Sequence, residues 1–337
     1  MIPLPEPART ARYCARALAY LLVAGAAAEG YGAAAPWKPT KPVELIVAVS
    51  VGSAHDETAR TMQNILRDYK LVPTPIVVMN KPGGSQTLAM SYLAQYPEDG
   101  HYLMLSAVPQ LTGKLTGKST LTYSDFTPIT QLFNEYVAFA VRKESPLRTG
   151  ADMASQLRSN PRALSIAIGS AVGNGPHLAL SLAMRQAGVK IQDLKTVVFS
   201  GGSEATIAVL GGHVDVLATT PGNVLPFIAR GEMRAIAMSS PKRLSGAYAQ
   251  VPTWKEQGID SVFSSFRFML GTRGMDAAQI AYWEQVFAKL TQTNEWKQYL
   301  EKHNLDPAPL GSRESETFLK EENARLQVVL RELGLTK

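Results

Sequence analysis

Two small-residue loops, each placed between a strand and a helix, are the residues whose types and spacing could bind an anion. The loop 50–55 (SVGSAH) follows the β-rich run 43–49, and the loop 169–175 (GSAVGNG) follows the apolar run 164–168. A helix N-terminus presents unpaired N–H groups and about half a positive charge, and small side chains let a ligand approach that backbone. Such loops can hold carboxylate or phosphate without Lys or Arg. Ordinary βα loops share this pattern, so spacing alone leaves both interpretations open.

Complete catalytic or metal-binding motifs are not found in the sequence. The five histidines are scattered, no His-Glu-x-x-His occurs, and the single Cys excludes a cysteine-based zinc or iron–sulfur site. The segment 201–205 (GGSEA) lacks the final Gly of a nucleophile elbow, and 117–119 (GKS) lacks the earlier Gly of a phosphate loop. We therefore expect no catalytic residue, no metal and no cofactor. An acid–base pair of His55 and Asp56 is the enzymatic alternative.

Strands and helices alternate along the chain, which is typical of α/β sheets with helices on both faces. We expect strands at 43–49, 76–79, 102–105, 136–141, 164–168, 196–199, 214–218 and 234–238, and an extended apolar segment at 263–270. A single core rarely serves more than about 250–300 residues, so 337 residues favour two lobes. No Pro/Ser-rich linker separates them, so we expect the chain to cross twice. Residues 36–142 and 267–337 would form the first lobe and 143–266 the second.

The first 35 residues have the order of a secretory signal peptide. Arg9, Arg12 and Arg16 precede the uncharged stretch 17–28, and small residues follow at 32–35. A membrane span needs about 20 apolar residues, and this run is shorter. We expect residues 1–35 to be removed on export to the periplasm. The remaining chain has no Cys, which suits an oxidising compartment.

The charge of the chain disfavours one class of partner. Charged residues make up 18% of the sequence and the net charge is +6. This excess is compatible with anionic ligands but is too small to indicate a nucleic-acid-binding protein.

Six short motifs occur in a fixed order from residue 42 onward. They are PVELIV at 42–47, VGSAHDETAR at 51–60, NKPGG at 80–84, DGHYL at 99–103, LGGHVDV at 210–216 and VPT at 251–253. Together they resemble the substrate-binding receptors of tripartite tricarboxylate transporters, also called Bug or TctC-like proteins. The resemblance covers essentially the whole chain from Lys38 onward.

This resemblance implies a type II periplasmic binding protein of the Venus-flytrap kind, with two α/β lobes that each contain a mixed sheet flanked by helices. It implies a receptor without catalytic activity that captures a small carboxylate, namely a dicarboxylate, a tricarboxylate or an aromatic acid. The partner would be the inner-membrane permease of the transporter, and the receptor would be a monomer. A periplasmic sensor that acts on a signalling partner is an alternative with the same features.

Carboxylates of the ligand would be held by the two loops, largely through backbone N–H groups, which is also what the loop pattern indicates. By position in the family, further contacts would follow the third strand, the strand 214–218 and the interlobe strand. The expected ligand-binding residues are Gly52, Ser53, Ala54, His55, Asp56, Ser106, Gly169, Ser170, Gly173, Asn174, Gly175, Thr219, Thr220, Phe266 and Arg267.

Several of these positions depart from the family pattern. Ser53 and Ala54 stand where relatives have Gly, His55 where they have Thr, and Thr219 where many have Asp. His55 could pair with an anion and titrate near neutral pH, or it could be an exposed residue of the first helical turn. Loss of the Asp favours an anionic ligand over an amino acid. Arg267 could be a bidentate carboxylate clamp or a hinge residue paired with an acidic neighbour, and we favour the clamp.

Overall fold

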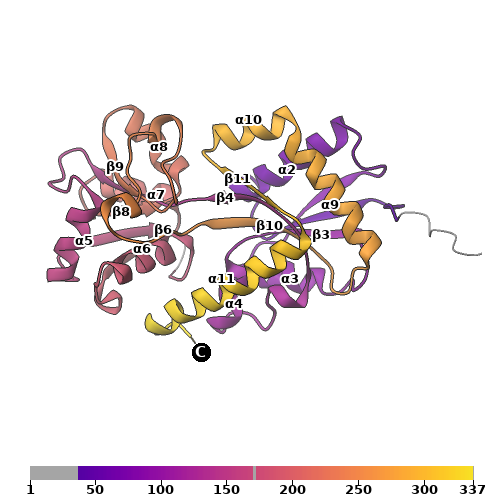
Figure 1. Cartoon of the computed structure of the whole chain (residues 1–337), viewed down its shortest axis with the longest axis horizontal. Coiled ribbons are helices and arrows are strands. Elements are labelled where there is room, and N and C mark those ends of the chain that lie inside the picture. The colour runs from indigo at the N-terminus through magenta and orange to yellow at the C-terminus, as the bar shows by residue number, and fades with distance from the viewer. Residues whose placement is uncertain (1–36, 170–171, 337) are drawn as a thin grey trace, which may run out of the picture. The chain divides into compact units, whose positions relative to one another are not determined.

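The computed structural model describes residues 37–169 and 172–336, so the predicted signal peptide lies outside the described residues. Lys38–Lys337 form one compact unit. This unit contains two sheets, each flanked by its own helices (Figure 1). Within the described residues, no helix is both long and apolar enough to cross a membrane.

The first sheet has six strands in the order β11-β4-β10-β3-β1-β2. Its strands are β1 (Val43–Val47), β2 (Ile76–Asn80), β3 (Tyr102–Ser106), β4 (Thr127–Glu135), β10 (Ser265–Gly271) and β11 (Asp306–Leu310). The first three are mutually parallel, and the other three pair antiparallel. Around this sheet lie α2 (Ala54–Asp68), α3 (Thr87–Leu93), α4 (Pro109–Leu115), α9 (Ala277–Gln292), α10 (Asn294–Lys302) and α11 (Ser312–Glu332) (Figure 1). Helix α2 shows why this layer forms, because Ala59, Met62, Ile65 and Leu66 recur at helical spacing and are buried.

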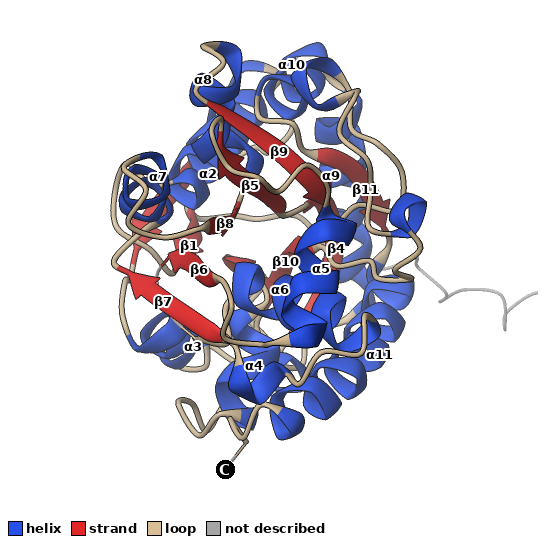
Figure 2. Ribbon diagram, turned by 90° about the vertical axis from the view of Figure 1, so that its left-hand side faces the viewer, coloured by secondary structure: helices blue, strands red, loops and turns tan. Residues whose placement is uncertain are grey.

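The second sheet has five strands in the order β7-β6-β8-β5-β9. Its strands are β5 (Ala138–Arg142), β6 (Ser165–Gly169), β7 (Lys195–Phe199), β8 (Val216–Thr219) and β9 (Met233–Met238). Its helices are α5 (Gly150–Ser159), α6 (Gly175–Gln186), α7 (Gly202–Leu210) and α8 (Pro221–Ala229). Figure 2 shows the strands following one another in this order, with α7 on one side and α6 on the other. Two mixed sheets flanked by helices were predicted, and this prediction is confirmed.

The chain enters the second sheet earlier than predicted. Strand β5 pairs with β8 and β9, so the crossing lies between Glu135 and Ala138 rather than at 142. The predicted lobe boundary was misplaced because the sequence between Pro128 and β5 contains no glycine or proline. No such residue marks the point where the chain leaves the first sheet for the second. The chain returns to the first sheet at β10. Helix α11 then reaches the second lobe, where Glu332 pairs with Arg185 of α6 at 2.6 Å.

Two strands of the first sheet, β4 and β11, were not predicted from the sequence. Strand β4 has the antiparallel partners β10 and β11, and its apolar residues do not alternate strictly with polar ones. Strand β11 contains Pro307 and Pro309, which argue against a strand in the interior of a sheet. It lies at the sheet edge, where a missing N–H does not interrupt a ladder on both sides.

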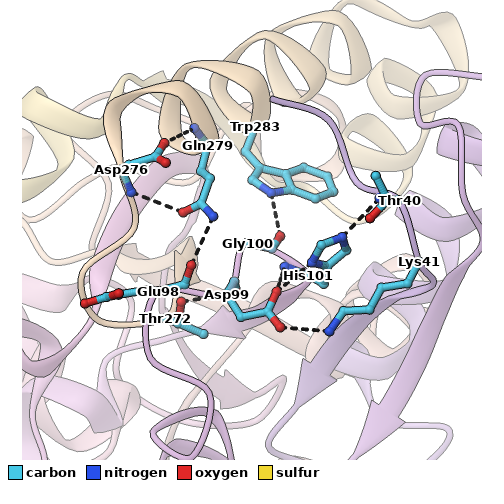
Figure 3. A network of polar contacts seen from close by, with 10 residues as sticks. All are labelled: Thr40, Lys41, Glu98, Asp99, Gly100, His101, Thr272, Asp276, Gln279 and Trp283. Atoms are coloured by element: carbon cyan, nitrogen blue, oxygen red, sulfur yellow. Dashed lines mark hydrogen bonds and ion pairs between the residues drawn. The ribbon is translucent and has the colours of Figure 1, made fainter. Parts of the chain in front are cut away.

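A polar network fixes the start of the folded unit to the turn before β3 (Figure 3). The backbone N–H of Thr40 donates to His101 Nε2 at 3.1 Å, and His101 Nδ1 lies 2.6 Å from an oxygen of Asp99. Because Nε2 accepts a hydrogen bond, the ring proton is on Nδ1 and donates to the carboxylate. The indole of Trp283 in α9 donates to the carbonyl oxygen of Gly100 at 2.9 Å. The motif at 99–103 therefore stabilises the fold, and it is separate in sequence from the two predicted binding loops.

Candidate functional site

A cavity of about 410 Å³ is lined by segments that follow parallel strands of both sheets. In the first lobe these segments are residues 48–49 after β1 and residues 107–109 after β3. In the second lobe they are residues 173–176 after β6, together with Thr219, the last residue of β8, and Thr220, which follows it. Ligands of α/β proteins bind in the crevice outside the carboxyl ends of such strands. The cavity therefore lies where the fold itself favours a binding site.

Eight of the predicted ligand-binding residues line this cavity: His55, Gly169, Gly173, Asn174, Gly175, Thr219, Thr220 and Arg267. The others are elsewhere. Ala54 lines a neighbouring cavity of about 150 Å³, and Ser170 lies outside the described residues. Gly52, Ser53, Asp56, Ser106 and Phe266 are absent from the cavity wall.

The carboxylate of Asp56 is held by the first loop itself. It accepts hydrogen bonds from the Gly52 N–H at 2.8 Å, from Arg60 Nε at 2.9 Å and from Asn80 Nδ2 at 2.9 Å. These donors, the Arg60 hydrogen bond above all, lower the pKa of Asp56 to about 2 despite the opposing effect of burial. These internal hydrogen bonds do not support the predicted ligand role of Asp56 and of the Gly52 N–H, which stays a prediction. An internal carboxylate stands beside the N-terminus of α2, where the prediction placed an anion.

His55 is the part of the first loop that lines the cavity. Its Nε2 atom is buried and has no hydrogen-bond partner. Burial, together with the positive charge of Arg267, lowers the pKa of His55 well below its ordinary value, so the ring is neutral at physiological pH. The expected titration near neutral pH is therefore not supported, whereas His55 lies in the first turn of α2 and its contact with a ligand stays a prediction. A neutral ring offers one donor and one acceptor to a bound molecule.

The second loop is held by hydrogen bonds within itself. Asn174 caps α6 by accepting the His177 N–H at 3.0 Å, and its amide group donates to the Gly169 carbonyl oxygen. The Gly173 N–H donates to Nδ1 of His177 at 3.0 Å, and burial lowers the pKa of His177 to about 4. Gly169 has a packing role, because a Cβ there would lie 2.5 Å from the nitrogen of Gly202. The loop reaches the cavity as predicted, but part of its donor capacity is used internally.

The turn between β8 and α8 presents two hydroxyl groups in a fixed arrangement. Asn223 Nδ2 donates to Thr219 Oγ1 at 2.9 Å and to Thr220 Oγ1 at 3.2 Å. Each hydroxyl oxygen therefore acts as an acceptor toward Asn223, which leaves its own hydrogen available to donate elsewhere. Gly202 makes room for this arrangement, since a Cβ there would lie 2.2 Å from Asn223 Nδ2. Sequence reasoning found both threonines but missed Asn223, although an Asn in the first turn of a helix can reach back to the residues before it.

Arg267 is paired within the protein, on the two strands that lead between the lobes. Its Nη2 lies 2.9 Å from Glu135 Oε2, and its Nη1 donates to Ser265 Oγ at 3.0 Å. Both partners line the cavity with it. The structure supports the alternative interpretation of Arg267 as a residue paired with an acidic neighbour, and its favoured role as a bidentate carboxylate clamp stays a prediction. The physical reason is that β4 and β10 are adjacent antiparallel strands, which places the two side chains close together.

Phe266 and Ser106 belong to the interior. Phe266 packs edge-to-face against Phe268 and Phe318, with ring centroids 5.3 and 5.2 Å apart. Along a strand, successive side chains point to opposite faces, so Phe266 and Arg267 cannot both face the cavity. Ser106 ends β3 with its side chain buried and its hydroxyl without a partner. This interior placement does not support the predicted ligand contacts of Phe266 and Ser106, which stay predictions.

The first lobe contributes a group of polar residues that the sequence analysis did not identify. Gln86 ends the short 3-10 helix Gly84–Gln86 before α3. Thr112 and Thr116 come from α4 and its end, and Lys118 comes from the turn after it. The loop motif at 80–84 gave a signal for this region, but the motif stops two residues before Gln86. Lys118 is exposed, and it lies in the segment 117–119 that resembles only the end of a phosphate loop.

The charges around the cavity nearly cancel. Among the described lining residues, Glu135 is the only carboxylate and is neutralised by Arg267, which leaves Lys118 as the unpaired cation. In residues 37–169 and 172–336, no group of three or more His, Cys, Asp or Glu side chains could hold a metal ion. The wall therefore offers hydroxyl, amide and imidazole groups with one positive charge at its edge.

Comparison with known proteins places this architecture in a family. The family model "Tripartite tricarboxylate transporter family receptor" matches residues 58–335. A Cupriavidus necator protein named "UPF0065 protein in gbd 5'region" is 27% identical over 301 residues, covering 89% of each chain.

Two solved structures share the fold. A TctC solute binding protein from Polaromonas, solved without ligand, aligns with a TM-score of 0.76 and 23% identity over 88% of this chain and 99% of its own. An R. palustris protein solved with adipate aligns with a TM-score of 0.74 and 24% identity over the same shares. The fold is that of a two-lobed periplasmic binding protein, as predicted. The chain therefore belongs to the tripartite tricarboxylate transporter receptor family, whose members are solute-binding proteins and not enzymes.

Proposed function

We propose that this protein is a periplasmic receptor that captures a small carboxylate between its two lobes and delivers it to the inner-membrane permease of a tripartite tricarboxylate transporter. The observation that carries the proposal is the cavity of about 410 Å³ to which both sheets contribute. On one wall, Asn223 holds the hydroxyl groups of Thr219 and Thr220 with their hydrogens available. Two adjacent hydroxyl donors suit the two oxygens of a carboxylate.

The hydrogen-bond pattern supports an acid as the ligand. Ser265 Oγ accepts from Arg267, so its hydroxyl hydrogen is also available to donate. Hydrogen bonds to a charged acceptor are about twice as strong as those between neutral groups. These hydrogen bonds become stronger when the lobes enclose the ligand, because the local dielectric constant falls.

The charge of the wall supports an acid over an amino acid. Glu135 is committed to Arg267, so no free carboxylate lies among the described lining residues to bind an ammonium group. The exposed ammonium group of Lys118 can approach a second acidic group of the ligand. The structural neighbour solved with adipate supports a dicarboxylate as one member of the ligand class.

The cellular setting belongs to the same proposal. Residues 1–35 would act as a signal peptide, and the exported chain would work as a monomer without a cofactor. Ligand would favour the closed arrangement of the lobes, with motion at the strands near Glu135 and Ser265. The permease would then recognise the closed receptor.

A thermal-shift screen of residues 36–337 tests the proposal. The panel contains C4–C6 dicarboxylates, citrate, benzoate derivatives, glutamate and aspartate. A ligand at about 100 times its Kd stabilises the folded state by about 2.7 kcal/mol, which raises Tm by several degrees. We expect at least one acid to do so, and glutamate and aspartate to bind more weakly than the matching dicarboxylates. A flat response to every acid would refute the proposal. Uptake of the identified acid by cells with and without the receptor and permease genes tests delivery.

A further inference from the structure

Gln86 adopts a backbone conformation that residues with side chains rarely adopt. Its φ is +75°, and the same loop has Gly83 and Gly84 at φ values of +123° and +57°. Glycine reaches positive φ without steric cost, whereas a glutamine does so at a cost.

The other described non-glycine residues with positive φ are Lys70, Glu98 and Asn304, and the first and last of these have a local explanation that Gln86 lacks. Lys70 and Asn304 follow the last residues of α2 and α10, and the next N–H in each case bonds back into the helix. This is the left-handed cap with which many helices end. Gln86 instead precedes α3, at a position that normally has extended backbone.

The side chain of Gln86 is buried in the wall of the cavity. It is 7% exposed, and its Oε1 atom has no hydrogen-bond partner. A buried amide oxygen without a partner costs free energy comparable to a lost hydrogen bond. Within the described part of the chain, no hydrogen bond of this side chain offsets that cost or the backbone strain. Strained, unsatisfied residues of this kind cluster at ligand sites.

We propose that Gln86 is a specificity-determining residue that reads a hydroxyl group on the bound acid, so that the receptor prefers a hydroxy acid to the matching acid without the hydroxyl. This inference rests on the proposed function, because it specifies the ligand of the same cavity. A hydroxyl can donate to the amide oxygen and accept from the amide nitrogen, so it satisfies Gln86 in either orientation of the amide. The unpartnered Nε2 of His55 in the same cavity offers the hydroxyl a second partner.

Isothermal titration calorimetry with matched pairs of acids tests this preference. The pairs are malate and succinate, 3-hydroxybutyrate and butyrate, and 4-hydroxybenzoate and benzoate. We expect the hydroxy member of the binding pair to have at least a tenfold lower Kd, because a site built to bond a hydroxyl rejects the analogue that lacks it. In Gln86→Gly and in Gln86→Leu, this ratio should fall below about threefold, while the Kd of the acid without the hydroxyl stays nearly unchanged.

Thermal stability separates this role from a structural one. Gln86→Gly removes the strain, so its Tm should equal or exceed that of the wild type. Lys70→Gly is the matched control, because it relieves positive φ at an exposed position outside the cavity and should leave both Kd values unchanged.

Each outcome has a distinct meaning. If acids bind without a hydroxyl preference, or if the preference survives in both Gln86 variants, the inference is wrong and the proposed function stands. A clear fall in the Tm of Gln86→Gly would also overturn it, since Gln86 would then hold the loop together. If no acid binds the wild type, either among these pairs or in the thermal-shift panel, the proposed function itself fails.

Discussion

Replacing Asp56 by asparagine removes one negative charge from a site that is organised around it. Three donors point at this carboxylate, from Gly52, Arg60 and Asn80, at 2.8–2.9 Å. The side chain is 3% exposed, so water cannot replace a lost partner. Asparagine has nearly the same shape but keeps only one acceptor oxygen and directs an NH₂ group at the donors. We expect Asp56→Asn to fold and to be less stable than the wild type at neutral pH.

The pKa of Asp56 gives the magnitude. It is lowered from 3.8 to about 2, chiefly by the Arg60 hydrogen bond. At 1.36 kcal/mol for each pKa unit, the carboxylate form stabilises the fold by about 2 kcal/mol. Because the pKa is lower in the folded state, this stabilisation is present above about pH 4 and is lost as the pH falls toward 2. For a chain of this length, it corresponds to a Tm difference of about 3 °C.

Urea unfolding of both proteins at pH 7 and at pH 2.5 measures the difference. Asp68→Asn is the control, because Asp68 lies on the same helix with its carboxylate 59% exposed and paired only with neighbouring Arg67. We expect the unfolding free energy of Asp56→Asn to be about 2 kcal/mol lower than that of the wild type at pH 7, and most of this difference to be lost at pH 2.5. For the control we expect a difference of less than about 0.5 kcal/mol. Equal stability of Asp56→Asn and the wild type at pH 7 would refute the reasoning, and so would a difference that does not shrink in acid.

Three further substitutions test the cavity and its surroundings. Asn223→Ala should raise the Kd for a bound carboxylate by about tenfold, because the two threonine hydroxyls lose the donor that orients them, and an unchanged Kd in calorimetry would contradict this. Glu135→Gln should lower the Kd for a bound carboxylate at least threefold and should also lower Tm, because Arg267 then presents an unpaired positive charge to the cavity. Weaker binding of the carboxylate would mean that Glu135 has another role. Phe266→Ala should cost about 3–5 kcal/mol in urea unfolding, because it empties a buried aromatic cluster, whereas a cost below 1 kcal/mol would contradict the interior placement.

Local patterns in the sequence predicted the elements that depend on local chemistry. Threonine is a favoured N-cap residue, and Thr149 caps α5 by accepting a hydrogen bond from the Asp152 N–H at 3.0 Å. The buried runs of β1 and β6 read as strands because parallel strands are apolar on both faces. Strand β11 could not be recognised, because its two prolines are tolerated only at a sheet edge. Its edge position depends on pairing with a strand about 170 residues earlier.

The sequence by itself determined the fold class, the family and the two loops that reach the cavity, because these depend on periodicity, turn residues and ordered motifs. Only the tertiary structure decided which polar groups remain available to a ligand. Glu135 lies 132 residues from Arg267 and neutralises it, and Asn80 lies 24 residues from Asp56 and helps to hold it. Hydrogen-bond capacity is limited for each atom, and burial prevents water from supplying a substitute. A predicted donor or acceptor can therefore contribute to a binding site only where the folded chain has not already paired it.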